Sequence, residues 1–181
     1  YDYADHQRRT KSEMPELRAN AMDNFAYLVQ TDTWMQGRGR FLPWEFLVHV
    51  VNHKTPLDER QWALANYLPR RAMIGHCYHD VPYDREMLDS GDRYTRLEGK
   101  PYTLPNLRTY GGVCCMQADY ASRVAKFLGV PAVYVGGTSC FGEGHAWGMW
   151  IELTGVTKNS LAFNLESHGR YDYDRYYVGY L

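Results

Sequence analysis

Gly112-Val-Cys-Cys-Met-Gln-Ala118 is the stretch that decides the fold, because it opens a helical pattern with a cysteine at its first position. From Cys114, the residues Ala118, Ala121 and Ala125 follow at spacings of four, three and four. This spacing is typical of one face of a helix. Gly129 is a suitable C-terminal cap. The pattern therefore predicts a helix that begins at Cys114 and ends at Gly129.

The segments on either side of this helix differ in their periodicity. After it we expect three strands, at Ala132–Val135, His145–Leu153 and Leu161–Glu166. Before it we expect helices at Ser12–Gln30, Pro43–His53 and Leu57–Leu68, and a short helix near Tyr83–Leu88. Helices that precede an antiparallel sheet predict an α+β fold.

The chain length of 181 residues fits one domain with a core of its own. Within this single domain, 1–181, we expect a helical N-terminal part (1–69), an irregular connection (70–109), a catalytic core (110–167) and a tyrosine-rich end (168–181). Because the first residue is Tyr1 rather than Met, we expect the chain to be part of a longer, truncated protein. The tyrosine-rich end is then expected to pack against this domain or a following one.

Composition and charge exclude several classes of partner. The formal net charge is -1 and the sequence contains no run of Lys or Arg, so we expect no nucleic-acid partner. No stretch approaches the length of a membrane span. The four cysteines, Cys77, Cys114, Cys115 and Cys140, are irregularly spaced, which argues against a disulfide scaffold. The sequence indicates no particular compartment.

Cys114 has the surroundings of a nucleophile. Only a thiolate attacks a carbonyl carbon, and a helix N-terminus or a nearby imidazolium favours the thiolate. The backbone N–H of Cys114 would also point out of the first helical turn, toward a developing oxyanion. Gly111 and Gly112 come just before it, and we expect Gly112 to let a substrate approach closely.

His145 is the predicted base. It begins a strand after the turn Phe141-Gly-Glu-Gly144, and its alternate neighbours along the strand are apolar. Trp147, two residues on, is expected to be both a core residue and one wall of the substrate cleft. A third residue should orient the imidazole through its other ring nitrogen. Asn164 on the next strand is our candidate for this role, and Glu166 is the alternative.

These residues carry a resemblance to a known family. Gly-Val-Cys114-Cys-Met-Gln-Ala, then Leu128-Gly-Val-Pro-Ala, then Gly144-His-Ala-Trp resembles the core of the transglutaminase-like superfamily, over roughly Tyr110–Ser167. The resemblance implies a papain-like fold, in which a central helix bearing the cysteine packs against an antiparallel sheet bearing the histidine. It also implies that Cys114 rather than Cys115 is the nucleophile, because an Ala follows four residues later.

The resemblance departs from the family at the third catalytic position. Members usually carry Asp there, whereas this sequence offers Asn164 or Glu166. Papain-like proteases use Asn in the same role. We interpret Cys115 as a buried structural residue and Cys140 as a loop cysteine.

The motif His76-Cys77-Tyr-His79-Asp80 holds imidazole, thiol and carboxylate groups close together. Structural zinc sites usually join two separated ligand pairs, and this motif has no convincing second pair. Calcium-using members of the superfamily suggest a calcium site, but no acidic calcium-loop pattern is present. We therefore predict a polar loop here, and no metal or other cofactor.

Together these features predict an enzyme that forms an acyl-enzyme with a peptide or protein substrate. Attack of water on this intermediate would make it a peptidase or amidase, which we favour. Attack of an amine would make it a protein-crosslinking transglutaminase. A third hypothesis is a binding or structural module that kept the fold without the activity.

Overall fold

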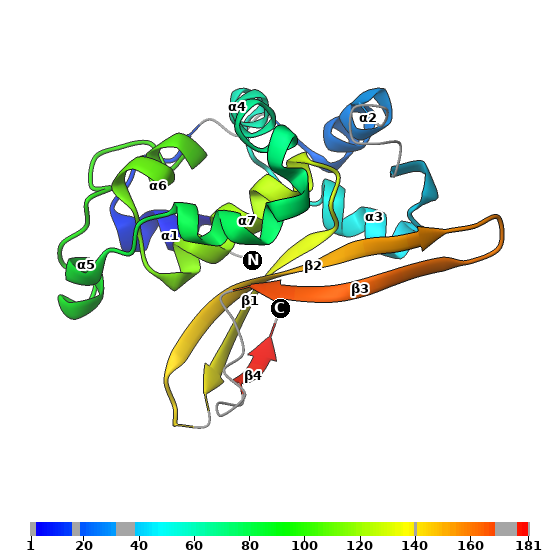
Figure 1. Ribbon diagram of the computed structural model, residues 1–181. Coiled ribbons are helices and arrows are strands. Elements are labelled where there is room, and N and C mark those ends of the chain that lie inside the picture. Colours follow the sequence, from blue (N-terminus) through cyan, green and yellow to red (C-terminus); the bar gives the residue numbers. More distant parts are fainter. Residues whose placement is uncertain (1–2, 16–18, 32–38, 140, 169–176, 181) are drawn as a thin grey trace.

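The computed structural model of the chain describes residues 3–15, 19–31, 39–139, 141–168 and 177–180 (Figure 1). Helices occupy most of the first two thirds of the sequence, and the strands follow. Within the described part of the chain, no helix combines the length and the apolar character needed to cross a bilayer.

The elements follow one another in the order helices, then strands. The helical elements are α1 (Tyr3–Thr10), α2 (Ala21–Thr31), η1 (Gly39–Phe41), α3 (Trp44–Val51), α4 (Leu57–Tyr67), η2 (Leu68–Asp80), α5 (Arg85–Asp89), α6 (Leu104–Tyr110) and α7 (Cys114–Phe127). The strands are β1 (Ala132–Ser139), β2 (Gly144–Val156), β3 (Leu161–His168) and β4 (Tyr177–Tyr180). The predicted α+β fold is confirmed.

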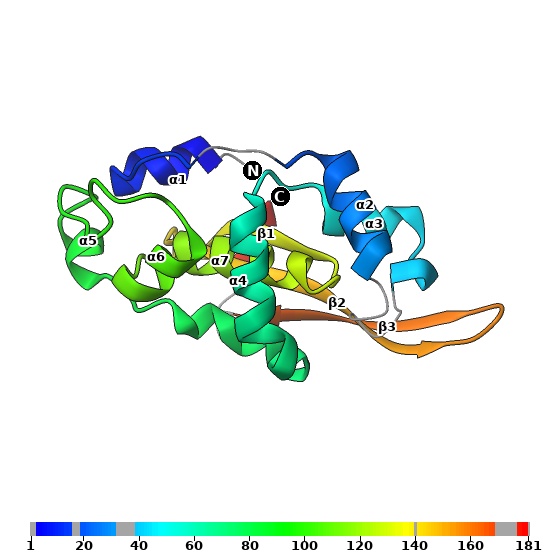
Figure 2. The same ribbon diagram turned by 90° about the horizontal axis from the view of Figure 1, so that it is seen from above.

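The four strands form one antiparallel sheet in the order β3-β2-β1-β4. Gly137 of β1 lies opposite His145 of β2, and Gly148 of β2 lies opposite His168 of β3. β2 has 13 residues and is the longest of the described strands. β2 begins at its turn with β1, passes α7 and continues into a long hairpin with β3, which projects beside α3 (Figures 1 and 2).

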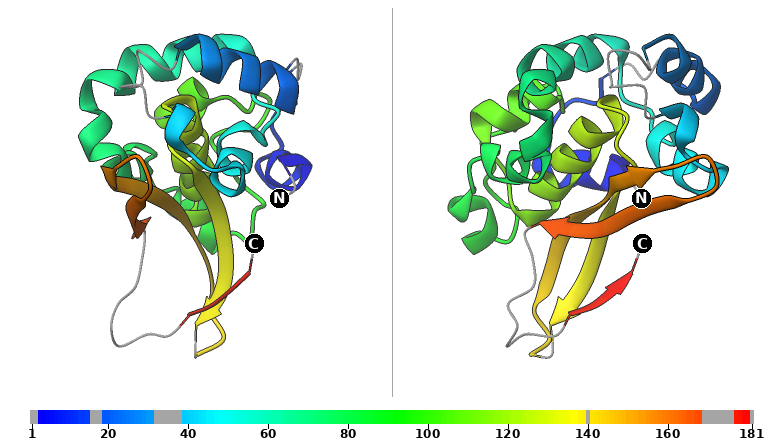
Figure 3. Two further views of the ribbon diagram at one scale, coloured as in Figure 1. Left: turned by 90° about the vertical axis from the view of Figure 1, so that its right-hand side faces the viewer. Right: turned by 45° about the vertical axis from the view of Figure 1, so that its right-hand side comes forward.

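α7 is the central helix: it packs on β1 and β2, and α4 and η2 also contact it (Figures 1 and 3). Its apolar side chains Met116, Tyr120, Val124 and Phe127 are buried in the main core. Two of its charged residues, Asp119 and Arg123, are buried and pair with each other at 3.1 Å. Arg123 bonds to Glu59 of α4 at 3.2 Å. Such pairing offsets the cost of removing the charges from water and fixes α7 against α4.

The predicted start of the helix Ser12–Gln30 is wrong. The chain instead forms α1, which sequence analysis missed, then an extended segment in which Glu13 bridges Pro101. α2 starts only at Ala21, because the Asn20 side chain accepts hydrogen bonds from the backbone N–H groups of Met22 and Asp23. A side chain that accepts from these N–H groups is a typical N-cap, and it fixes where the helix begins.

The expected irregular connection 70–109 is more ordered than its Pro and Gly content suggests. η2 crosses its beginning and α6 its end, and the short helix expected near Tyr83–Leu88 is α5. α5 begins at Arg85 because the carboxylate of Asp84 accepts from the backbone N–H of Met87. Local capping by side chains therefore organises a segment without helical periodicity.

The tyrosine-rich end contributes a strand that we did not predict. β4 pairs with β1 in antiparallel fashion, with Gly179 opposite Gly137. This part of the end therefore packs against the domain itself. The residues 169–176 and 181 lie outside the described part of the chain.

Candidate active site

Cys114 is the first residue of α7, where the chain turns from an extended segment into the helix. Val113 is the N-cap residue, with φ −94° and ψ −176°, and its side chain makes no capping hydrogen bond. The first N–H groups of a helix have no partner within it, and they carry the positive end of its dipole. The position therefore favours a thiolate and offers N–H donors to an oxyanion.

His145 meets Cys114 from the beginning of β2. Hydrogen bonds from the Cys115 thiol, the His145 side chain and the backbone N–H of Ala146 lower the pKa of Cys114 well below its usual range. The positive charge of His145 acts in the same direction, while partial burial opposes it. The structure thus brings together the two residues that the sequence singled out as nucleophile and base.

Ala146 shows how the helix end and the strand meet. Its carbonyl oxygen accepts a hydrogen bond from the Tyr78 hydroxyl at 3.1 Å, and its N–H donates to Cys114. The N–H and C=O of one residue in an antiparallel strand point to the same edge. Tyr78 of η2 and Cys114 of α7 therefore reach β2 from one edge, and this edge positions the Cys114 sulfur.

Trp147 is buried, in agreement with its expected place in the core. It is 3% exposed. Its ring stacks on that of His145, with centroids 6.0 Å apart and an interplanar angle of 21°. Residues two apart in a strand share a face, which is why the two rings meet. Trp147 therefore supports the imidazole from behind and presents little surface to a substrate.

Gly112, which we expected to contact a substrate, has a packing role in the structure. It is buried, its N–H donates to the Pro82 carbonyl, and its own carbonyl accepts from Asp84. A Cβ at Gly112 would lie 2.6 Å from the Cβ of Met116. Gly111 has φ +87°, and a Cβ there would lie 2.3 Å from the Pro82 carbonyl oxygen. Both glycines therefore allow the segment at Pro82 to pack against the start of α7.

Replacement of Gly111 by Ala is expected to cost about 3 kcal/mol or more of the free energy of unfolding, because the new Cβ meets backbone atoms that cannot turn aside. Gly91 is the matched control: it has φ +61° and open space around the site of a Cβ. Gly91→Ala should cost only about 1–2 kcal/mol, from the backbone conformation. Urea denaturation measures both values. Equal losses would show that contact with Pro82 is unimportant.

Asn164 and Glu166 do not lie where the sequence hypothesis requires. Asn164 is exposed and pairs with Glu152, seven residues along β2 from His145, or about 23 Å at 3.3 Å per residue. Glu166 pairs with Trp150, five residues from His145. Both also belong to the opposite face of the sheet from His145, since paired residues share a face. Neither side chain can orient the imidazole.

Replacement of Asn164 by Ala is therefore expected to leave turnover within about twofold of that of the unchanged protein, because surface substitutions away from a site have small effects. Steady-state rates against a common substrate are the measurement. A loss of tenfold or more would contradict the register of β2 against β3 given above.

Arg9 and Cys115 are the neighbours of the nucleophile that sequence analysis missed or misjudged. The Arg9 guanidinium donates to the Cys115 sulfur at 2.9 Å, across 106 positions of sequence. Cys115 is buried, as we expected, yet its thiol also contacts Cys114. No local pattern could reveal the link, since α1 itself was not predicted. The adjacency of two cysteines at a helix start was the one available signal.

The predicted polar loop at His76–Asp80 is the end of η2. Cys77 is buried and His76 is exposed, so their side chains diverge. Among the described residues, no group of three or more His, Cys, Asp or Glu side chains is arranged to hold a metal ion. Cys77, Cys114 and Cys115 are free thiols. Cys140 lies outside the described residues.

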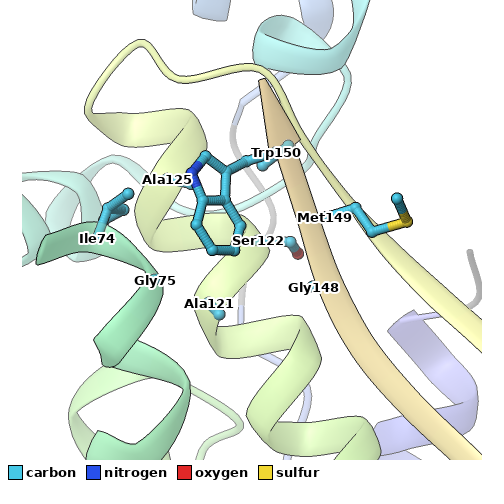
Figure 4. Close-up of a pocket in the computed structure, with 9 residues that line it drawn as sticks. Ile74, Gly75, Ala121, Ser122, Ala125, Gly148, Met149 and Trp150 are labelled. Atoms are coloured by element: carbon cyan, nitrogen blue, oxygen red, sulfur yellow. The ribbon is translucent and has the colours of Figure 1, made fainter. Parts of the chain in front are cut away.

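A small crevice lies farther along α7, between this helix, η2 and β2 (Figure 4). Its volume is about 10 Å³, enough for roughly one water molecule. Figure 4 shows the Trp150 indole over α7 and the Met149 side chain directed away from the helix. The crevice begins at Ala121, two helical turns beyond Cys114. It is too small to accept a substrate, and it marks the face of β2 that packs on the helix.

Comparisons with known proteins give a coarse result. No protein-family profile matches the chain, and no curated protein matches its sequence significantly. Among solved structures, the chain is similar to a protein from Cytophaga hutchinsonii that is provisionally assigned as a cysteine protease. The TM-score is 0.43 and the sequence identity is 14%. The match covers 77% of this chain and 56% of that one, so this chain spans little more than half of that protein's length.

Proposed function

We propose that the chain is a cysteine-nucleophile enzyme that forms an acyl-enzyme with amide bonds of peptides or proteins. One observation carries the proposal: the Cys114 sulfur, at an uncapped helix N-terminus, receives a hydrogen bond from His145. Nucleophile and base in contact at a source of N–H donors are the components of covalent acyl transfer. The resemblance of the surrounding sequence to the transglutaminase-like superfamily supports the same chemistry.

In the proposed reaction, the Cys114 thiolate attacks the carbonyl carbon of an amide, and a C–S bond forms. The backbone N–H groups at the start of α7 stabilise the oxyanion. The C–N bond then breaks as His145 gives its proton to the departing nitrogen. A water molecule transfers a proton to His145 and attacks the thioester, after which the C–S bond breaks and the thiolate returns.

Hydrolysis is the outcome that we favour over transfer to an amine. Incubation with a digest of denatured protein, in water enriched in oxygen-18 and containing cadaverine, separates the two by mass spectrometry. Hydrolysis places the heavy oxygen in new carboxyl groups, whereas transfer attaches cadaverine to acyl groups. Neither product above the level given by Cys114→Ala, together with ordinary thiol reactivity of Cys114, would favour the non-catalytic module instead.

A further inference from the structure

The helix α1 places a positive charge beside the two thiols at the start of α7. Arg9 Nη1 lies 2.9 Å from the Cys115 sulfur. The opposite side of the guanidinium is held by Asp92, with Nε–Oδ2 and Nη2–Oδ1 distances of 2.7 and 3.2 Å. This two-point contact to a carboxylate fixes the plane of the guanidinium. The Nη1 group is thereby aimed at Cys115.

Cys115 can pass this contact on to the nucleophile. Its sulfur accepts the hydrogen bond from Arg9, so its S–H hydrogen is available to a second partner. Two acceptors lie near it, the Met116 sulfur at 3.3 Å and the Cys114 sulfur. A thiolate is a far stronger acceptor than a thioether, so an ionised Cys114 takes this hydrogen bond.

Of the two thiols, Cys115 keeps its proton and Cys114 ionises. The hydrogen bond to Cys114 raises the pKa of Cys115 and burial adds to the effect, while the positive charge of Arg9 lowers this pKa and opposes both. The same hydrogen bond lowers the pKa of Cys114. The proton therefore stays on Cys115, which is 3% exposed, and leaves Cys114, which is only partly buried.

We propose that Arg9 and Cys115 are positioning residues for the nucleophile: Arg9 orients the Cys115 thiol, whose S–H donates to the Cys114 thiolate. The proposal rests on the proposed function, because it concerns the ionisation of the same Cys114. It adds a second support for the thiolate, on the side of α7 that α1 covers, to the contact with His145.

Other ionisable groups act on this pair of thiols and are part of its electrostatics. They come from α1 and from every element around the helix start. These groups are His6, which acts by way of Arg9, and Asp92, Tyr78, Tyr83 and His145. Burial first, and then the nearby Cys114, raises the pKa of Tyr78 and of Tyr83. Both tyrosines therefore stay neutral while the thiolate forms. Asp92 partly offsets the charge of Arg9, so orientation is the main effect of Arg9.

The test is the pH dependence of Cys114 alkylation by iodoacetamide, with the labelled residue identified by peptide mass spectrometry. In Cys115→Ala, which lacks the donor, the midpoint should rise by about one pH unit, so labelling below both midpoints slows about tenfold. Cys115→Ser keeps a donor and should recover most of this change. Arg9→Gln should move the midpoint in the same direction as Cys115→Ala.

Two controls separate this role from a merely structural one. Arg8 is the neighbouring arginine on α1 and pairs with the exposed Asp5, so Arg8→Gln should leave the midpoint unchanged. In the double variant Arg9→Gln/Cys115→Ala, the Arg9 change should add little, because Arg9 acts through Cys115. Thermal unfolding of each variant identifies any loss of fold.

The outcomes distinguish this proposal from the proposed function. A low midpoint that rises in His145→Ala but is unchanged in folded Cys115→Ala and Arg9→Gln would overturn the role of Arg9 and Cys115 alone. An ordinary free-thiol midpoint for Cys114 in the unchanged protein would overturn both. Preferential labelling of Cys115 at low pH would show that Cys115 ionises and Cys114 keeps its proton.

Discussion

Cys114→Ala is expected to lower turnover of a peptide substrate by about 10⁴-fold or more. The variant loses the only atom that forms the covalent bond with the acyl group. Cys114 is the first residue of α7 and is only partly buried, so removal of its sulfur should cost little stability. Initial rates of peptide hydrolysis are the measurement, with circular dichroism to verify the fold.

Cys77→Ala is the matched control for this prediction. Cys77 is buried in the core, and burial raises its pKa, so its thiol is unreactive. The control should lose some stability and retain activity in its folded fraction. Equal activity of Cys114→Ala and the unchanged protein would remove Cys114 from the mechanism.

His145→Ala is expected to have the second largest effect, a loss of about 10²–10⁴-fold in turnover through the missing proton transfer. It should also change the acid side of the pH profile. The thiolate of Cys114 is stabilised by hydrogen bonds from Cys115, from His145 and from Ala146. Without the imidazole, one hydrogen bond and one positive charge are lost, so the pKa of Cys114 rises.

The direction of the pH effect follows from this rise. A lowered pKa keeps Cys114 ionised as the pH falls below the ordinary thiol value of about 8.5, and ionisation is lost only near the lowered pKa. In His145→Ala the loss should occur at higher pH, and labelling at a pH below both midpoints should slow about tenfold for each pH unit by which the midpoint rises. His76→Ala, at an exposed histidine of η2, is the control. A midpoint of Cys114 labelling that does not move in His145→Ala would contradict the hydrogen bond between His145 and Cys114.

The start of α7 could be predicted because its determinants are local. Apolar spacing, a preceding pair of glycines and a closing glycine all fall within 20 residues around Cys114. The same holds for β2, whose alternation identifies His145 and Trp147 as residues of one face. The packing role of Gly112 was not predicted, because no local pattern measures burial. Packing of Pro82 and Met116 decides the role of the glycines.

The choice of Asn164 failed for a reason that is specific to sheets. Alternation along a strand tells which residues share a face, but the register across strands is set by hydrogen bonds between distant segments. In this register, residues nearer to His145 along β2 face later residues of the chain, as Gly148 faces His168.

By itself, the sequence determined an α+β chain in which a cysteine opens a helix and a histidine opens a strand. These features depend on periodicities and turn residues within short segments. Only the tertiary structure decided that Cys114 and His145 meet, and that Arg9 reaches Cys115. It also placed Asn164 far along the sheet from His145 and on the opposite face of the sheet. Each of these depends on contacts between segments far apart in sequence, because strand register and helix packing are properties of the whole core.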